Sequence, residues 1–188
     1  MPVNYTKVII SLIRKDPERM MILRTARSLD LKDWCIGAGF VRNCVWDHLH
    51  NYNSSTRLND IDVCYYNSNC LDEKVDKVLE VTLENKLPGK RWSVKNQARM
   101  HRKNKCKQYE NTKDATSYWP EIQTAVGVSI NYNDEITIRT AYSIERLFSL
   151  MIERTSKCLS EEAFLARIKQ KRWLEIWPKL KISSANDL

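Results

Sequence analysis

Two acidic residues, Asp60 and Asp62, stand one residue apart at the start of an apolar segment, Ile61–Tyr66, that is typical of a β-strand. Alternate side chains of a strand share one face, so both carboxylates are expected to point the same way. Two neighbouring carboxylates repel each other unless a cation neutralises them, and Mg²⁺ or Mn²⁺ suits such oxygen ligands. The pair therefore predicts a divalent-metal site with Asp60 and Asp62 as its ligands.

A second chemical feature lies upstream, where Gly37 and Gly39 separate a short apolar strand from a segment with helical spacing. Glycine lets the backbone approach a ligand closely, and the free N–H groups at a helix start attract phosphate. Arg42 and Asn43 fall in the first turn of that helix, where they would reach the same anion. The stretch predicts a phosphate-binding turn. A simple tight turn and an ordinary surface arginine are the alternative interpretation.

Basic residues follow a third expected strand, Trp92–Asn96. Lys95, Asn96, Arg99 and His101 are the candidates there for contacts with nucleotide phosphates or with a polyanionic acceptor. A solvated loop is the alternative, and a lone histidine is more often structural than catalytic. This strand carries no acid, so it does not supply the third carboxylate that a two-metal phosphoryl-transfer site usually recruits.

The composition bounds what the protein can be. The 188 residues, 43% hydrophobic and 29% charged, are enough for one good core. A net charge of +8, concentrated in residues 90–107 and 167–172, describes a basic protein that attracts polyanionic partners. Six cysteines without a CxxC pair favour reduced thiols and no disulfide-linked partner. We expect a cytoplasmic protein with no membrane partner, because there is no signal-peptide pattern and no apolar run of about 20 residues.

The elements that must position these residues follow from hydrophobic periodicity. Helices are expected over residues 8–13, 19–29, 40–50, 71–84, 112–119, 144–153 and 161–177, and strands over residues 34–36, 61–66, 92–96, 124–131 and 135–139. The outline predicts an α+β (mixed α/β) fold in which helices flank a small mixed sheet. We expect a single domain over residues 1–188, with N-terminal helices (1–30), a sheet core with the site (31–140) and C-terminal helices (141–188).

Six segments, in this order, resemble a bacterial nucleotidyltransferase-like family, formerly a domain of unknown function, within the DNA polymerase beta-like nucleotidyltransferase superfamily. They are WCIGAGFVRNCVWDHLH, NDIDVCYYN, WSVKNQARMH, SYWPEIQTAVGVSI, RLFSL and KRWLEIWPKL. The resemblance implies the superfamily fold, a nucleoside triphosphate as substrate and Mg²⁺ as cofactor. By matching position it implies metal-ligand and catalytic roles for Asp60 and Asp62, and phosphate-side roles for Gly37, Gly39, Arg42 and Asn43. The block from Lys95 to His101 is a hallmark of the family, with an inferred place beside the site.

Two segments depart from the family pattern. Tyr66-Asn67 stands where the family usually has an aromatic residue and an aspartate, and residues 142–148 lack the usual proline-containing, acidic segment. The leading hypothesis is a metal-dependent nucleotidyltransferase whose acceptor stays open: RNA or another polyanion, a small molecule or a protein side chain. The alternative is a catalytically weak nucleotide- or RNA-binding module on the same scaffold. A kinase or other phosphotransferase is a third option.

Overall fold

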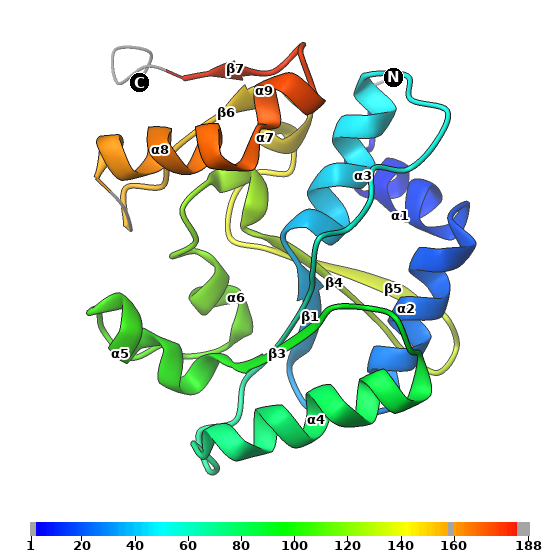
Figure 1. The fold of residues 1–188 in the computed structure, drawn as a ribbon, viewed down its shortest axis with the longest axis vertical. Coiled ribbons are helices and arrows are strands. Elements are labelled where there is room, and N and C mark those ends of the chain that lie inside the picture. The colour runs from blue at the N-terminus through cyan, green and yellow to red at the C-terminus, as the bar shows by residue number, and fades with distance from the viewer. Residues whose placement is uncertain (1–2, 158–159, 184–188) are drawn as a thin grey trace.

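A mixed five-stranded sheet, in the order β3-β2-β1-β4-β5, lies at the centre of the computed structural model, which describes residues 3–157 and 160–183 (Figure 1). Strands β2 and β3 are parallel, and the other neighbouring pairs are antiparallel. Helices flank this sheet, so the predicted α+β class is confirmed. The strands are β1 (Trp34–Gly37), β2 (Ile61–Tyr65), β3 (Trp92–Asn96), β4 (Val126–Ile130) and β5 (Ile136–Thr140).

The helices precede, connect and follow these strands. In Figure 1, α4 runs along the β3 edge of the sheet, while α9 lies next to α3 at the opposite end of the molecule and α8 extends away from α3 on the other side of α9. A separate pair of two-residue strands, β6 (Met151–Ile152) and β7 (Lys181–Ile182), ties the two ends of the C-terminal segment together. The helices are α1 (Tyr5–Arg14), α2 (Pro17–Arg27), α3 (Gly39–Leu49), α4 (Glu73–Lys86), α5 (Met100–Asn104), α6 (Thr112–Thr116), α7 (Glu145–Phe148), α8 (Glu161–Lys171) and α9 (Trp173–Ile176).

Helix α2 shows how local sequence sets an element boundary. The Asp16 carboxylate accepts a hydrogen bond of 3.0 Å from the backbone N–H of Arg19, and Pro17 occupies the first helical position. Both arrangements stabilise a helix start, because they satisfy or remove N–H groups that lack a partner there. Asp16 is therefore the N-cap of α2.

Tryptophan packing attaches the C-terminal helices to α3. Trp46 is fully buried in α3 and meets Trp173 and Trp177 edge-on, with ring centroids 5.5 and 5.0 Å apart. Both partners are at most 2% exposed, so they belong to the core. Aromatic pairs in this geometry add stability beyond the apolar area that they bury. They fix α9, which begins at Trp173 and is followed by Trp177, against α3.

The two predicted C-terminal helices are shorter in the structure than the apolar spacing indicates. The helix expected over 144–153 ends at Phe148, and Met151 and Ile152 pair with β7 instead. The helix expected over 161–177 breaks at Arg172. Leu150 and Arg172 have φ angles of 59° and 54°, a left-handed conformation that ends or redirects a helix. Glycine usually marks such a position, and here neither residue is glycine.

Other predicted boundaries and features differ less. The helix expected over 112–119 ends at Thr116, and the strand expected from residue 124 begins at Val126 after a short 3₁₀ turn. None of the described helices has the length and apolar character needed to cross a membrane. Cys158 lies outside the described residues. The described cysteines are free thiols: Cys35, Cys44, Cys64, Cys70 and Cys106.

Candidate functional site

The end of β1, the start of α3 and the start of β2 meet at a pocket of about 420 Å³, which we call the carboxylate pocket. Because β1 and β2 are antiparallel, with Ile36 opposite Val63, the end of one strand lies level with the start of the other. The structure thereby brings together five of the predicted site residues. The residues lining the pocket include Gly39, Arg42 and Asn43 of α3, Asp60 and Asp62 at β2, and Arg167 and Lys171 of α8.

The charge of Asp60 acts on the second carboxylate of this pocket, Asp62. Burial, and then the charge of Asp60, raise the pKa of Asp62 to about 6, while a hydrogen bond with Ser93 and the cations Lys171 and Arg42 act in the opposite direction. The net result is that Asp62 loses its proton with a pKa of about 6 instead of the ordinary 3.8. Burial and the neighbouring negative charge thus outweigh the two cations, and a divalent cation would relieve the remaining repulsion.

The donor set of the pocket fits a magnesium ion. Mg²⁺ is commonly held by one or two carboxylates, with water and substrate phosphates completing its octahedral shell. Asp60 and Asp62 supply two carboxylates, while the described part of the chain holds no group of three or more His, Cys, Asp or Glu side chains suited to a metal. The residues that would hold the ion are therefore Asp60 and Asp62, with the remaining positions left to phosphate oxygens and water.

Replacing Asp62 by asparagine should stabilise the metal-free protein at pH 7. A folded-state pKa of about 6 against the ordinary 3.8 means that the folded protein holds this proton more tightly than the unfolded chain. The resulting cost is absent below pH 3.8, grows as the pH rises to 6 and is constant above it. We expect Asp62→Asn to raise the free energy of unfolding by roughly 1–3 kcal/mol at pH 7, measured by urea unfolding in EDTA. Exposed Asp30→Asn is the control, and a less stable Asp62→Asn protein would contradict the prediction.

Arg42 supplies a fixed positive charge to the pocket. It is 8% exposed, and its guanidinium lies over the Trp173 ring at 4.3 Å and donates hydrogen bonds of 3.2 and 2.9 Å to Oδ1 of Asn43. Burial lowers its pKa to about 10, so the side chain is still charged at neutral pH. A Cβ on Gly39 would lie 3.3 Å from this guanidinium. Glycine at position 39 therefore makes room for the Arg42–Asn43 pair.

Glycine at position 37 is explained by a different structural constraint. It is buried at the end of β1, and a Cβ there would collide with the ring of Trp119. Gly37 does not appear among the described residues that line the carboxylate pocket. The packing against Trp119 explains why glycine stands at this position, and its predicted phosphate contact stays a prediction.

Asp47 positions two walls of the pocket from within α3. The buried carboxylate accepts hydrogen bonds of 2.8 Å from the Thr56 N–H, 2.6 Å from the Thr56 hydroxyl and 2.8 Å from the Trp177 indole. Thr56 begins the segment that leads to Asp60, and Trp177 lies in the C-terminal part that covers the pocket. One carboxylate thus holds together three parts of the chain that are distant in sequence.

Arg167 and Lys171 are the site residues that sequence reasoning missed. They are four residues apart in α8 and therefore share one face of the helix. Arg167 donates a hydrogen bond of 2.6 Å to the fully buried Glu121, which orients it. Lys171 forms no hydrogen bond or ion pair with a described residue, and its charge acts on Asp62. The basic run 167–172 was the available signal, but no sequence pattern shows which strand the helix covers.

Lys95 and Asn96 lie farther along the sheet, away from the carboxylate pocket. Parallel pairing places Ser93 beside Asp62 and Asn96 beside Tyr65, three residues or about 10 Å away. Lys95 forms an ion pair of 3.2 Å with Glu80 of α4. Asn96 is fully buried and donates hydrogen bonds of 2.8 Å to the backbone oxygens of the 67–70 turn. Its contacts here shape that turn.

Arg99 and His101 also lie away from the carboxylate pocket. Arg99 forms an ion pair with the fully buried Asp76 of α4, and Nδ1 of His101 is 3.0 Å from the Ala98 carbonyl oxygen. In the described structure, neither these two residues nor Lys95 and Asn96 line the pocket. Their predicted contacts with nucleotide phosphates stay predictions, and their present partners are structural.

Comparisons with known proteins agree on the fold. A family model for nucleotidyltransferases matches residues 24–182. A solved NMR structure, described as revealing a CCA-adding enzyme head domain, is 30% identical to this chain. The match covers 94% of this chain and 95% of that one, with a TM-score of 0.81. No curated protein matches the chain.

Two longer enzymes share the fold at lower identity. The first is a CCA-adding enzyme in complex with CTP, with a TM-score of 0.58 and 14% identity over 98% of this chain and 44% of that one. The second is the Thermotoga maritima CCA-adding enzyme in complex with tRNA, with a TM-score of 0.55 and 14% identity over 98% of this chain and 43% of that one. This chain spans less than half the length of these two enzymes.

Proposed function

The chain belongs to the nucleotidyltransferase family, and from this premise we propose that it transfers a nucleoside monophosphate from a nucleoside triphosphate to an acceptor, with Asp60 and Asp62 as ligands of Mg²⁺ or Mn²⁺. The acceptor hydroxyl would release its proton to solvent as its oxygen bonds to the α-phosphorus, and the bond from that phosphorus to the departing pyrophosphate would break. The observation that carries the proposal is the carboxylate pocket, where two acids and several cations face one space.

The cations of the pocket would bind the triphosphate. Arg42, Arg167 and Lys171 line it together with the first turn of α3, which among the described residues has no side-chain cap. Backbone N–H groups at such a helix start and fixed positive charges both favour phosphate oxygens. These groups would orient the triphosphate and stabilise the charge that develops on the pyrophosphate.

Asp60 and Asp62 would hold the metal ion beside this triphosphate. A bound Mg²⁺ supplies neutralisation of phosphate charge and polarisation of the reacting oxygens. The raised pKa of Asp62 means that the pair takes up a proton near pH 6 when it is not neutralised otherwise, so metal binding should weaken below that pH. The pocket is therefore suited to work at neutral or higher pH.

RNA is the acceptor class that best fits the remaining facts. The net charge of +8 attracts a polyanion, and the structural matches include a CCA-adding enzyme in complex with tRNA. The second candidate function is a nucleotide- or RNA-binding module with weak catalysis. This alternative is favoured because the described residues of the pocket offer two carboxylates, without the third that a two-metal phosphoryl-transfer site usually recruits.

A transfer assay separates these two functions. Each nucleoside triphosphate, labelled at the α-phosphate, is incubated with the protein, Mg²⁺ and total cellular RNA. If the protein is a transferase, the RNA becomes covalently labelled and an equal amount of pyrophosphate is released. Metal-dependent binding of a triphosphate with neither product would favour the binding module.

Lys171→Ala should raise the KM for the triphosphate about tenfold and change kcat less, because one charge-assisted contact with the phosphates is lost. Steady-state kinetics over a range of triphosphate concentrations would measure both constants. Lys169→Ala is the matched control, since this lysine is exposed on the same helix and does not line the pocket. Equal KM values for the two variants would remove Lys171 from the triphosphate site.

A further inference from the structure

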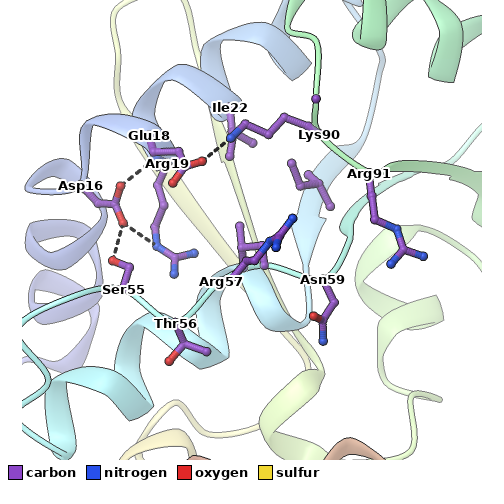
Figure 2. Close-up of a pocket in the computed structure, with 13 residues that line it drawn as sticks. Asp16, Glu18, Arg19, Ile22, Ser55, Thr56, Arg57, Asn59, Lys90 and Arg91 are labelled. Atoms are coloured by element: carbon purple, nitrogen blue, oxygen red, sulfur yellow. Dashed lines mark hydrogen bonds and ion pairs between the residues drawn. The ribbon is translucent and has the colours of Figure 1, made fainter.

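A second pocket, of about 390 Å³, adjoins the carboxylate pocket (Figure 2). The two pockets share one wall, the segment 56–59, which leads directly into Asp60. The far side of the second pocket comes from α2 and from residues 89–91, which precede β3. We call it the arginine pocket, because Arg19, Arg57 and Arg91 all line it.

The acids of the arginine pocket already have partners. Asp16 lies 3.1 Å from Nε of Arg19 and accepts a hydrogen bond of 3.0 Å from Ser55, and Glu18 forms an ion pair with Lys90. Figure 2 shows these contacts along one side of the pocket. The charges of Asp16 and Glu18 are therefore neutralised by Arg19 and Lys90.

Arg57 and Arg91 remain as cations without such a partner. Within the described residues, neither guanidinium forms a hydrogen bond or an ion pair, and both side chains are exposed. In Figure 2 they come from different segments, and Arg57 extends across the space between Arg19 and Arg91. Guanidinium groups bind phosphate oxygens through paired N–H donors, so two of them in one polar pocket suit a phosphate group.

We propose that the arginine pocket binds a phosphate group of the acceptor and thereby places the acceptor next to Asp60. The proposal rests on the proposed function. The triphosphate already has its own cations, Arg42, Arg167 and Lys171, on the other side of the shared wall. A phosphate held by Arg57 and Arg91 would therefore belong to the second substrate, and the reacting hydroxyl would reach over the wall toward the carboxylates.

Two single variants test the division between the pockets. Arg91 lines only the arginine pocket and Lys171 only the carboxylate pocket, whereas Arg57 lines both. Binding of a fluorescein-labelled single-stranded RNA dodecamer with a free 3′ hydroxyl is measured by anisotropy, and binding of Mg²⁺ with each triphosphate by calorimetry. Arg91→Ala should weaken RNA binding about tenfold, reduce its salt slope by about 0.7 and leave triphosphate binding within about twofold. Lys171→Ala should do the reverse.

Lys74→Ala is the control, because this lysine is exposed on α4 and lines neither pocket. RNA binding by Arg91→Ala that equals this control overturns the proposal, and so does an equal loss of RNA binding in Lys171→Ala.

A second arm with glucose 6-phosphate distinguishes the source of the phosphate. If only this ligand binds, and Arg91→Ala weakens it, the acceptor is a small phosphorylated molecule, whereas a wild-type protein that binds neither ligand refutes the pocket assignment.

Failure of the proposed function would look different. In that case the wild-type protein would bind no triphosphate and transfer no label, while Arg91→Ala would still weaken RNA binding. The arginine pocket would then be a phosphate site without the transfer chemistry next to it.

Discussion

Asp60→Asn is expected to lower the rate of nucleotidyl transfer about 10³-fold or more without unfolding the protein. Asparagine keeps the size of the side chain but removes one of the two charges that would hold the metal ion beside the triphosphate. A loss of several kcal/mol of charge stabilisation in the transition state corresponds to a rate effect of this size. Transfer of label from the α-phosphate at saturating triphosphate, with a magnesium titration, would measure it.

The stability of the same variant makes this result interpretable. Asp60 contributes to the raised pKa of Asp62, so removing its charge should lower that pKa and leave the metal-free protein at least as stable as the wild type. Asp30→Asn, an exposed replacement of the same kind, should change neither rate nor stability. Wild-type transfer by a folded Asp60→Asn protein would refute the assignment of Asp60 to the metal site.

The part of the site that sequence predicted is the part that is local in the chain. Gly39, Arg42, Asn43, Asp60 and Asp62 lie within one strand-helix-strand unit of about 30 residues, and period-2 alternation fixes which face the two acids share. Antiparallel pairing of β1 and β2 then brings the two motifs to the same end of the sheet. Short-range patterns were sufficient for this much.

The remaining contributors are long-range and had no such pattern. Arg167 and Lys171 lie in a helix that directly precedes Trp173 and Trp177, and these pack on Trp46, more than 100 residues earlier in the chain. Hydrophobic spacing predicted a helix there, but spacing does not tell which helices pack together. The break at Arg172, which a left-handed residue other than glycine produces, was equally invisible.

Strand register explains why the predicted basic residues lie elsewhere. The sequence predicted β3 with correct boundaries, but parallel pairing with β2 places Ser93, not Lys95 or Asn96, beside Asp62. Nothing in the strand itself specifies that offset, because one register differs from another only in contacts with distant residues. The basic residues of this region that do line a pocket are Lys90 and Arg91, just before the strand.

Asp76→Ala should be among the most destabilising substitutions in this chain. Asp76 is fully buried in α4, where it accepts hydrogen bonds of 2.7 Å from the Tyr65 hydroxyl and 3.2 Å from the Asn96 N–H and forms an ion pair with Arg99. Alanine would leave the 10% exposed Arg99 side chain without its buried counter-ion, and the other donors without an acceptor. Such a loss costs about 3–5 kcal/mol, or a fall in Tm of roughly 6–20 °C for a chain of this size.

The matched control and the kinetics of Asp76→Ala would also settle what Arg99 does. Glu73 lies 3.7 Å from the same guanidinium but is 80% exposed, so Glu73→Ala should change stability by less than about 0.5 kcal/mol.

If Arg99 is a structural counter-ion, the folded fraction of Asp76→Ala keeps the wild-type KM for the triphosphate below its lowered Tm. A KM for the triphosphate that changes severalfold in the folded protein would instead indicate that Arg99 binds the substrate. A Tm of Asp76→Ala equal to that of Glu73→Ala would refute the buried ion pair. The two variants, measured by thermal unfolding and steady-state kinetics, therefore decide between a residue that builds the sheet edge and one that binds phosphate.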